Sequence, residues 1–488
     1  MVIDSFCTTN GKKFVHQELE RSQTPCSTAE SKILQHAVGA SKNLEQDSKT
    51  IEMAARKVST GDEEAEPFVE QEEEEKLHKG MGWKRAAFTM MAEIVGTGVL
   101  GLSHAAAKVG GGLALTFLVS FGLASLFSSL LLAAVRREHP KVDSFQACAD
   151  LLGGERARRL TALCINTSWL FVLPYYLMAS AHALSVAFWW TDTCYATWAL
   201  LSVALIGVPA QVRTFEGISS LSALSVASVA IALLVIGVEL VRGGQKETDA
   251  SWSKPESSSV WDCFDAISST TFAYQGQSML LEIAHEMENA PRDFGKAITA
   301  SCGGLLALYS IATGLGYYYR GARVAGFLPD DLEDNASKTL VGLMLYFHVA
   351  VTYLVNNQPL SKKLYELRWG SIETKSRVVA LRWFCITMVL LAWSFVVANA
   401  IPWFSAFQAL MGSLLGAPIM FLFPVAFYVL DPRQATHLKH LPTRCALAAT
   451  GGIILPLTLG VGSVAAFVGL SEAWGDGAAF ACVPGGYE

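Results

Sequence analysis

Residues 92–105 read AEIVGTGVLGLSHA, an apolar run that carries one carboxylate, Glu93, followed by three glycines in six positions. A charged side chain at the centre of a membrane span costs about 2.5 to 3.5 kcal/mol, so an acid there is a functional candidate by default. Desolvation disfavours the ionised form of a carboxyl group, which makes Glu93 a candidate to bind and release a proton. The alternative is a structural acid that stays hydrogen-bonded to a tyrosine, or to a histidine such as His182 or His348.

The glycines in this run, Gly96, Gly98 and Gly101, predict a break in the helix. A helix in lipid must pair its backbone groups internally, so a Gly-Thr-Gly interruption persists at membrane depth only where it lines a cavity or packs within protein. In transporters, the N–H groups freed by such a break lie at the positive end of the second half-helix and face an anionic substrate group. The alternative for a single break is the close packing of two helices through small residues.

A second interruption favours the cavity interpretation. Residues 268–287 read SSTTFAYQGQSMLLEIAHEM, with the polar group YQGQ at 274–277 between two apolar halves. With five spans per repeat, this sixth span is equivalent to the first. Paired breaks at equivalent positions predict a midplane site in an inverted 5+5 repeat, with one extra C-terminal helix outside the repeats.

Eleven apolar segments of about 20 residues, the length that crosses a hydrocarbon core of about 30 Å, must position these groups. They cover residues 84–109, 112–135, 159–187, 196–212, 217–241, 263–288, 295–319, 338–360, 378–400, 403–430 and 443–470. Only 16% of the residues are charged and 52% are hydrophobic, against about 25% charged in soluble proteins. The sequence therefore predicts an all-α polytopic membrane protein. Pro402 must either separate two of these spans or kink one.

The distribution of charged residues predicts the character of the N-terminal segment and the orientation of the chain in the membrane. Residues 1–80 hold 10 Lys and Arg against 16 Asp and Glu, and we expect a disordered acidic cytosolic tail there. The loops on the predicted cytosolic side carry 18 Lys and Arg and the opposite loops carry seven, which places the N-terminus inside. The membrane domain is expected over 81–470 and a short non-cytosolic tail over 471–488.

Further residues suggest smaller roles. Thr352 and Asn356 lie four residues apart on one helix face, where they can offer oxygen atoms to a cation or a substrate, or bond a neighbouring helix. Cys194 and Cys263 lie in or beside outside loops, where a disulfide is permitted. A sequon at Asn335 predicts glycosylation in another outside loop.

Several function classes lack a signal in the sequence. No Cys-x-x-Cys pair or metal-ligand spacing of His and Cys predicts a metal site. No phosphate-binding loop, dinucleotide fingerprint, nucleophile elbow or basic nucleic-acid patch is present either. We therefore expect neither an enzyme nor a nucleic-acid-binding protein.

Three stretches resemble the amino acid/auxin permease family. They are 92–105, 272–298 (FAYQGQSMLLEIAHEMENAPRDFGKAI) and 397–424 (VANAIPWFSAFQALMGSLLGAPIMFLFP). Within that family the sequence is most similar to the fungal-type neutral amino acid permeases, and the resemblance covers about residues 82–470. It implies a LeuT-type fold of eleven helices that carries a neutral amino acid and is driven by an ion gradient.

The resemblance also implies site residues. The backbone amides of Gly96, Thr97 and Gly98 would meet the substrate carboxylate. The side-chain and amino-group side of the pocket would be bordered by Phe272, Tyr274 and Gly276, with an aromatic surface from Tyr176 as a further candidate. The chain departs from the family at Ser103, where proline is usual, and at Ala92, where sodium-coupled relatives tend to carry asparagine.

These observations combine into one expected function. We expect proton-coupled transport, by symport or antiport, with Glu93, Thr352 and Asn356 as the coupling-ion residues. Sodium is the less favoured ion because Ala92 replaces the asparagine, and no other cofactor is expected. The protein would act as a monomer in the plasma or vacuolar membrane. An amino acid sensor of the same fold, with little or no flux, is the alternative.

Overall fold

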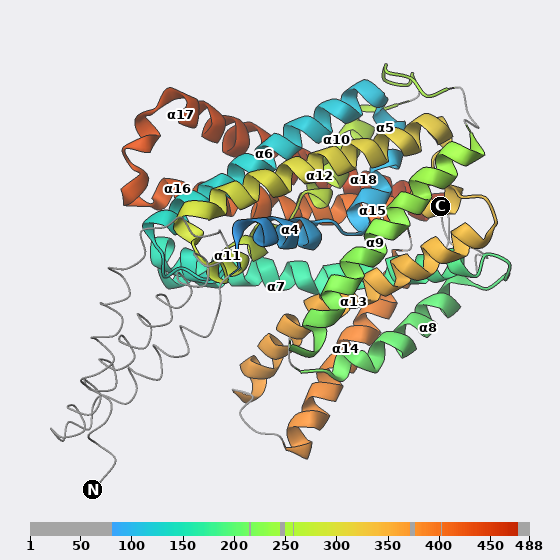
Figure 1. Cartoon of the computed structure of the whole chain (residues 1–488), viewed down its shortest axis with the longest axis horizontal. Coiled ribbons are helices and arrows are strands. Elements are labelled where there is room, and N and C mark those ends of the chain that lie inside the picture. The colour runs from blue at the N-terminus through green and yellow to red at the C-terminus, as the bar shows by residue number, and fades with distance from the viewer. Residues whose placement is uncertain are drawn as a thin grey trace, which may run out of the picture. The chain divides into compact units, whose positions relative to one another are not determined.

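A computed structural model of the chain describes residues 81–213, 216–244, 249–256, 258–370, 376–401 and 403–476. The predicted N-terminal tail lies outside the described residues, as does the C-terminal tail after residue 476. Within the described part the chain forms helices joined by short loops, with a single β-bridge between Met81 and Met287. The all-α class expected from the sequence is confirmed (Figure 1).

The helices follow the predicted segments closely, although several are shorter, longer or broken. They are α4 (Trp83–Ile94), α5 (Leu102–Val109), α6 (Gly111–Glu138), α7 (Phe145–Ala187), α8 (Tyr195–Gly207), α9 (Glu216–Gly243), α10 (Val260–Ala273), α11 (Gln277–His285), α12 (Ala290–Arg320), α13 (Ala336–Trp369), α14 (Arg377–Ala400), α15 (Phe404–Leu410), α16 (Phe423–Leu430), α17 (Leu441–Leu447) and α18 (Ser463–Asp476). A 3-10 turn, η1 (Thr97–Gly101), precedes α5. Helix α18 continues six residues beyond the predicted end of the last span.

Eight continuous helical stretches of the described chain are long and apolar enough to cross a membrane. Two of them, 404–430 and 441–474, run through π-helical turns that join α15 to α16 and α17 to α18. A ninth candidate is the pair formed by α4 and the continuous η1 and α5, which is bent by 53°. The other two predicted spans correspond to α8, which has only 13 residues, and to the short halves α10 and α11. The count of eleven spans therefore stays a prediction.

The packing of the helices supports a five-span repeat. Spans are numbered here in the order of the eleven predicted segments, so that α4 and α5 form span 1, α6 is span 2, α10 and α11 form span 6, and α12 is span 7. Helix α12 packs against α4, α5 and α6, and α10 packs against α5 and α6. Spans 1, 2, 6 and 7 therefore form one group. Helix α7 packs against α8, α13 and α14, and α14 packs against α8 and α13, so spans 3, 4, 8 and 9 form another (Figure 1). In an inverted 5+5 repeat, spans that are five apart in the chain are equivalent. The first group contains the equivalent pairs 1 and 6 and 2 and 7, and the second contains 3 and 8 and 4 and 9.

The two predicted breaks are present, and they lie against each other. Between α4 and η1, Val95 and Gly96 are extended, and between α10 and α11 the helix is interrupted from Tyr274 to Gly276. A Cβ atom on Gly276 would lie 2.3 Å from Cγ1 of Ile94, and one on Gly98 would lie 3.0 Å from Cα of Ala273. The glycines are needed here because a side chain would push the two breaks apart.

The predicted disulfide between Cys194 and Cys263 is wrong. Cys194 is disulfide-bonded, but Cys263 is a free cysteine. Cys263 lies in the first turn of α10, and its Sγ contacts the carbonyl of Ser259 in its own helix terminus at 3.8 Å. Position beside an outside loop was therefore insufficient to predict the pairing.

The sequon asparagine Asn335 is the N-cap of α13. Its side-chain oxygen accepts hydrogen bonds from the backbone N–H groups of Ser337 and Lys338, and its amide nitrogen donates to Glu239 at 3.2 Å. These contacts provide a structural role for Asn335, and its glycosylation stays a prediction.

Candidate functional site

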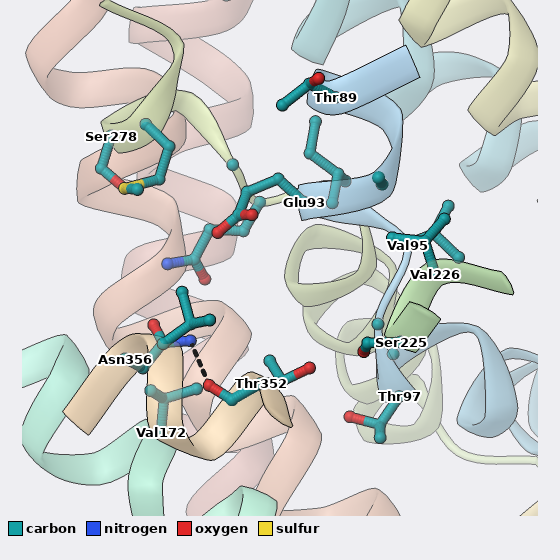
Figure 2. A pocket seen from close by; sticks show the side chains of 18 of the residues that line it. Thr89, Glu93, Val95, Thr97, Val172, Ser225, Val226, Ser278, Thr352 and Asn356 are labelled. Atoms are coloured by element: carbon teal, nitrogen blue, oxygen red, sulfur yellow. Dashed lines mark hydrogen bonds between the residues drawn. The ribbon is translucent and has the colours of Figure 1, made fainter. Parts of the chain in front are cut away.

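A cavity of about 440 Å³ lies between the two breaks, within the usual size range of small-molecule sites. It is lined by α4 and the break after it, by α7, α9 and α13, and by the break between α10 and α11. Figure 2 shows Glu93, Thr97, Thr352 and Asn356 around this space. The cavity extends from the breaks toward Met81 at the start of α4 and Glu286 after the end of α11.

The break in the first span leaves unpaired backbone donors in residues that line the cavity. Gly96, Thr97 and Gly98 all line it. They stand at the start of the helical stretch 97–109, where the first N–H groups have no intrahelical partner. The same end carries the partial positive charge of the helix dipole. This arrangement suits a carboxylate group, as the resemblance implied.

The Thr97 side chain adds an unpaired hydroxyl at this point. Thr97 is buried, and its Oγ1 has no hydrogen-bond partner within the described part of the chain. It lies near the hydroxyl of Tyr175 but without the geometry of a hydrogen bond. The hydroxyl is enclosed in this structure, and because a buried polar atom without a partner is costly, a change that exposes it to the cavity would favour its contact with a ligand.

Glu93 lies in the last turn of α4 and is exposed to the cavity. Among the described residues its carboxylate has no hydrogen-bond or ion-pair partner, and Tyr176 lines the same cavity. Neither histidine considered as a permanent partner takes that role: His348 Nδ1 is 2.9 Å from Oγ of Ser225, and the ring of His182 packs among aromatic rings.

Thr352 and Asn356 line the same cavity from α13. Thr352 Oγ1 donates to the carbonyl of His348 at 2.9 Å, and Asn356 Nδ2 donates to the carbonyl of Thr352 at 2.9 Å (Figure 2). Because these bonds use the donor groups, the hydroxyl and amide oxygens keep acceptor capacity for a ligand. Their role with a coupling ion stays a prediction.

The predicted aromatic residues separate into two groups. Tyr176 and Phe272 line the cavity, as does Gly276. Tyr274 does not: it is completely buried, with its ring 5.1 Å from that of Tyr309 on α12 and its hydroxyl directed at Gly122 on α6. The prediction that Tyr274 borders the pocket is wrong because the backbone of the break turns this side chain toward α6.

Gln408 on α15 was missed by the sequence interpretation. Its side chain is completely buried, and Nε2 donates to the carbonyls of Gly98 at 3.1 Å and Ser269 at 3.3 Å. Its Oε1 accepts a hydrogen bond from Tyr175 at 3.3 Å. Gln408 therefore joins spans 1, 3 and 6 on the side of the breaks away from Met81. Its only signal in the sequence was a polar residue within the stretch 397–424.

This side of the molecule is closed by further contacts. The ring of Tyr175 lies 4.9 Å from that of Phe272 and 5.1 Å from that of Phe404. Lys108 on α5 forms a 2.7 Å ion pair with Asp265 on α10. The half-helices beyond the breaks are thus held together, while the cavity extends in the opposite direction.

Comparisons with known proteins agree with this arrangement. A family model described as transmembrane amino acid transporter protein matches residues 79–447. An N amino acid transport system protein of Neurospora crassa is 24% identical, over 73% of this chain and 78% of that protein. Amino acid permease 8 of Arabidopsis thaliana is 23% identical, over 77% of this chain and 90% of that protein.

Among solved structures, that of MhsT in complex with L-phenylalanine matches with a TM-score of 0.45 and 14% identity, over 78% of this chain and 96% of that one. The family model covers well over half of the chain. The protein therefore belongs to the transmembrane amino acid transporter family, the amino acid/auxin permeases.

Proposed function

We propose that this protein is a secondary active transporter that moves neutral amino acids together with, or in exchange for, protons. Membership of an amino acid transporter family supports amino acid transport. One observation supports proton coupling: a carboxylate without a partner among the described residues, Glu93, shares a cavity with the unpaired N–H groups at the start of η1.

In this mechanism the substrate carboxylate binds the N–H groups of Gly96, Thr97 and Gly98, because the positive end of a half-helix favours an anion. The rest of a neutral substrate then lies against Tyr176 and Phe272, which line the same cavity. Glu93 accepts the transported proton, since its acceptor oxygens have no competing donor in the described structure. Neutralisation of Glu93 would remove a negative charge from the path of the zwitterion.

The closed and extended sides of the cavity support alternating access. Gln408 and Tyr175 close one side, and the cavity extends on the other side toward Met81 and Glu286. With the N-terminus on the cytosolic side, as the charge distribution predicts, this is an inward-facing state. The opposite state requires that the contacts of Gln408 with spans 1, 3 and 6 break.

Reconstitution into proteoliposomes tests this proposal. We expect saturable uptake of neutral amino acids that an imposed proton gradient accelerates, and that a sodium gradient of equal size leaves unchanged. In Glu93→Gln the acceleration should disappear, because the amide cannot exchange a proton. Glu288→Gln, which changes an exposed acid outside the cavity lining, is the matched control and should keep it.

Two outcomes would contradict the proposal. Unchanged pH dependence in Glu93→Gln would remove Glu93 from the coupling mechanism. Saturable amino acid binding by the wild type without flux would favour the alternative, a sensor of the same fold. A panel of amino acids in the same assay would show whether neutral substrates are preferred.

A further inference from the structure

Tyr309 on α12 connects the two breaks. It is completely buried, and its hydroxyl oxygen lies 2.8 Å from the carbonyl oxygen of Ala273 and 3.3 Å from that of Ile94. Ala273 is the last residue of α10 and Ile94 is the last residue of α4. One phenolic proton is therefore shared between the C-terminal ends of both first half-helices.

Such a junction is electrostatically suited to a cation. The last carbonyls of a helix lack intrahelical partners and carry the negative end of the helix dipole. In transporters with broken helices, these carbonyls and the unwound backbone beside them coordinate the coupling cation. Two half-helix ends that meet without a positive group between them would repel each other.

We propose that the Tyr309 hydroxyl takes the place of a coupling cation at this junction. Its O–H bond presents a partial positive charge to both carbonyls and holds the two breaks together without a bound metal ion. The Tyr309 ring packs 5.1 Å from that of Tyr274, and its hydroxyl is directed at these two backbone carbonyls. Tyr309 is thus a positioning residue, and sodium is not needed at this point.

This inference depends on the proposed transport function only where uptake is measured. Its main test detects sodium binding by thermal unfolding and requires no transport. Tyr309→Phe removes the hydroxyl and leaves two carbonyls facing a gap of about one oxygen atom, which a small cation can occupy. Tyr353→Phe is the matched control because Tyr353 is also completely buried, and its hydroxyl contacts Ser394 at 3.2 Å, away from the breaks.

The test compares the thermal unfolding of purified protein in sodium chloride and in choline chloride of equal ionic strength. The wild type should unfold at the same temperature in both salts. Tyr309→Phe should unfold several degrees lower in choline chloride, and added sodium should raise this temperature saturably. Tyr353→Phe should show no saturable response to sodium. Uptake by Tyr309→Phe should fall roughly fivefold without sodium, as for one lost hydrogen bond, and recover in part with it.

Three results would overturn the proposal. Saturable stabilisation of the wild type by sodium would mean that a cation site exists beside Tyr309, and this measurement needs no variant. Equal destabilisation of Tyr309→Phe in both salts would reduce the hydroxyl to a packing role, and no destabilisation would remove its role altogether. Absence of uptake by the wild type would instead contradict the proposed function and leave the unfolding test to decide the role of Tyr309.

Discussion

The break in the first span keeps its polar groups beside the cavity without partners, whereas at the break in the sixth span Tyr274 and Gln277 turn into the protein and Gln275 lines the cavity. At the first break, the Glu93 carboxylate and the Thr97 hydroxyl have no hydrogen-bond partner among the described residues, and both residues line the cavity. At the sixth, Gln277 accepts a hydrogen bond from the Gly276 N–H at 3.0 Å and donates to Ser125 Oγ at 3.0 Å.

This difference suggests a division of roles between two equivalent positions. The first break supplies groups that can bind ligands, so it must keep them unpaired. The sixth break is anchored to α6, since Ser125 Oγ also lies 3.4 Å from the carbonyl of Tyr274. The anchored sixth break thus provides a fixed surface against which the first break packs. Substitutions at the two breaks should therefore affect different measurements.

The largest effect is expected where the two breaks touch. In Gly276→Ala the new Cβ would lie 2.3 Å from Cγ1 of Ile94, so the breaks must separate. Overpacking of this kind costs about 1 to 3 kcal/mol, so uptake should fall roughly fivefold to 150-fold. Gly303→Ala on α12 is the control, because no atom lies within 4 Å of its new Cβ. Equal uptake by both variants would mean that close contact between the breaks is not required.

The hydrogen bonds that anchor the sixth break to α6 should contribute to the thermal stability of the protein. Gln277→Leu leaves the Gly276 N–H without its acceptor and removes the donor to the Ser125 hydroxyl, at a side chain that is completely buried. A buried group left unpaired costs about 1 to 3 kcal/mol, so the unfolding temperature should drop clearly. The KM of the protein that remains folded should change little. A large change in KM with normal stability would assign Gln277 to the binding site instead.

The reverse pattern is expected at the first break. Thr97→Val keeps the shape of the side chain and removes a hydroxyl that has no partner in the described structure, so stability should be unchanged. If the hydroxyl contacts the substrate, KM should rise about fivefold to tenfold, as for the loss of about 1 kcal/mol. Thr116→Val is a suitable control, since Thr116 Oγ1 bonds the carbonyl of Gly112 within α6, away from the cavity. A drop in stability with unchanged KM would refute a binding role.

The smallest effect is expected at Tyr274. Its hydroxyl is directed at Gly122 and has no hydrogen-bond partner in the described residues. Tyr274→Phe should therefore leave uptake within about twofold and stability within about 0.5 kcal/mol. A large rise in KM would mean that this side chain reaches the cavity in another state of the transport cycle.

Part of the candidate site was predictable from residue types and spacing. An acid and a Gly-Thr-Gly group inside one apolar span, and a polar group at 274–277 inside another, are local signals because lipid tolerates neither without a protein environment. The structure places Glu93, Gly96, Thr97, Gly98 and Gly276 around one cavity. Helical spacing likewise put Thr352 and Asn356 on one face of α13.

Other features depend on contacts between distant segments. Tyr309 and Ala273 are 36 residues apart, and Gln408 reaches a carbonyl 310 residues away. Neither residue differs by type from the other tyrosines and glutamines of the chain. The direction of Tyr274 is of the same kind, because the backbone orientation at a break decides where a side chain points.

The sequence by itself determined the class of protein, the apolar spans and the places where two of them had to break, because each follows from the cost of unpaired backbone and charge in lipid. Only the tertiary structure decided that the two breaks meet, that one faces the cavity while the other is anchored to α6, and that Tyr309 joins their ends. Those outcomes depend on the close approach of helices, which periodicity and composition do not encode.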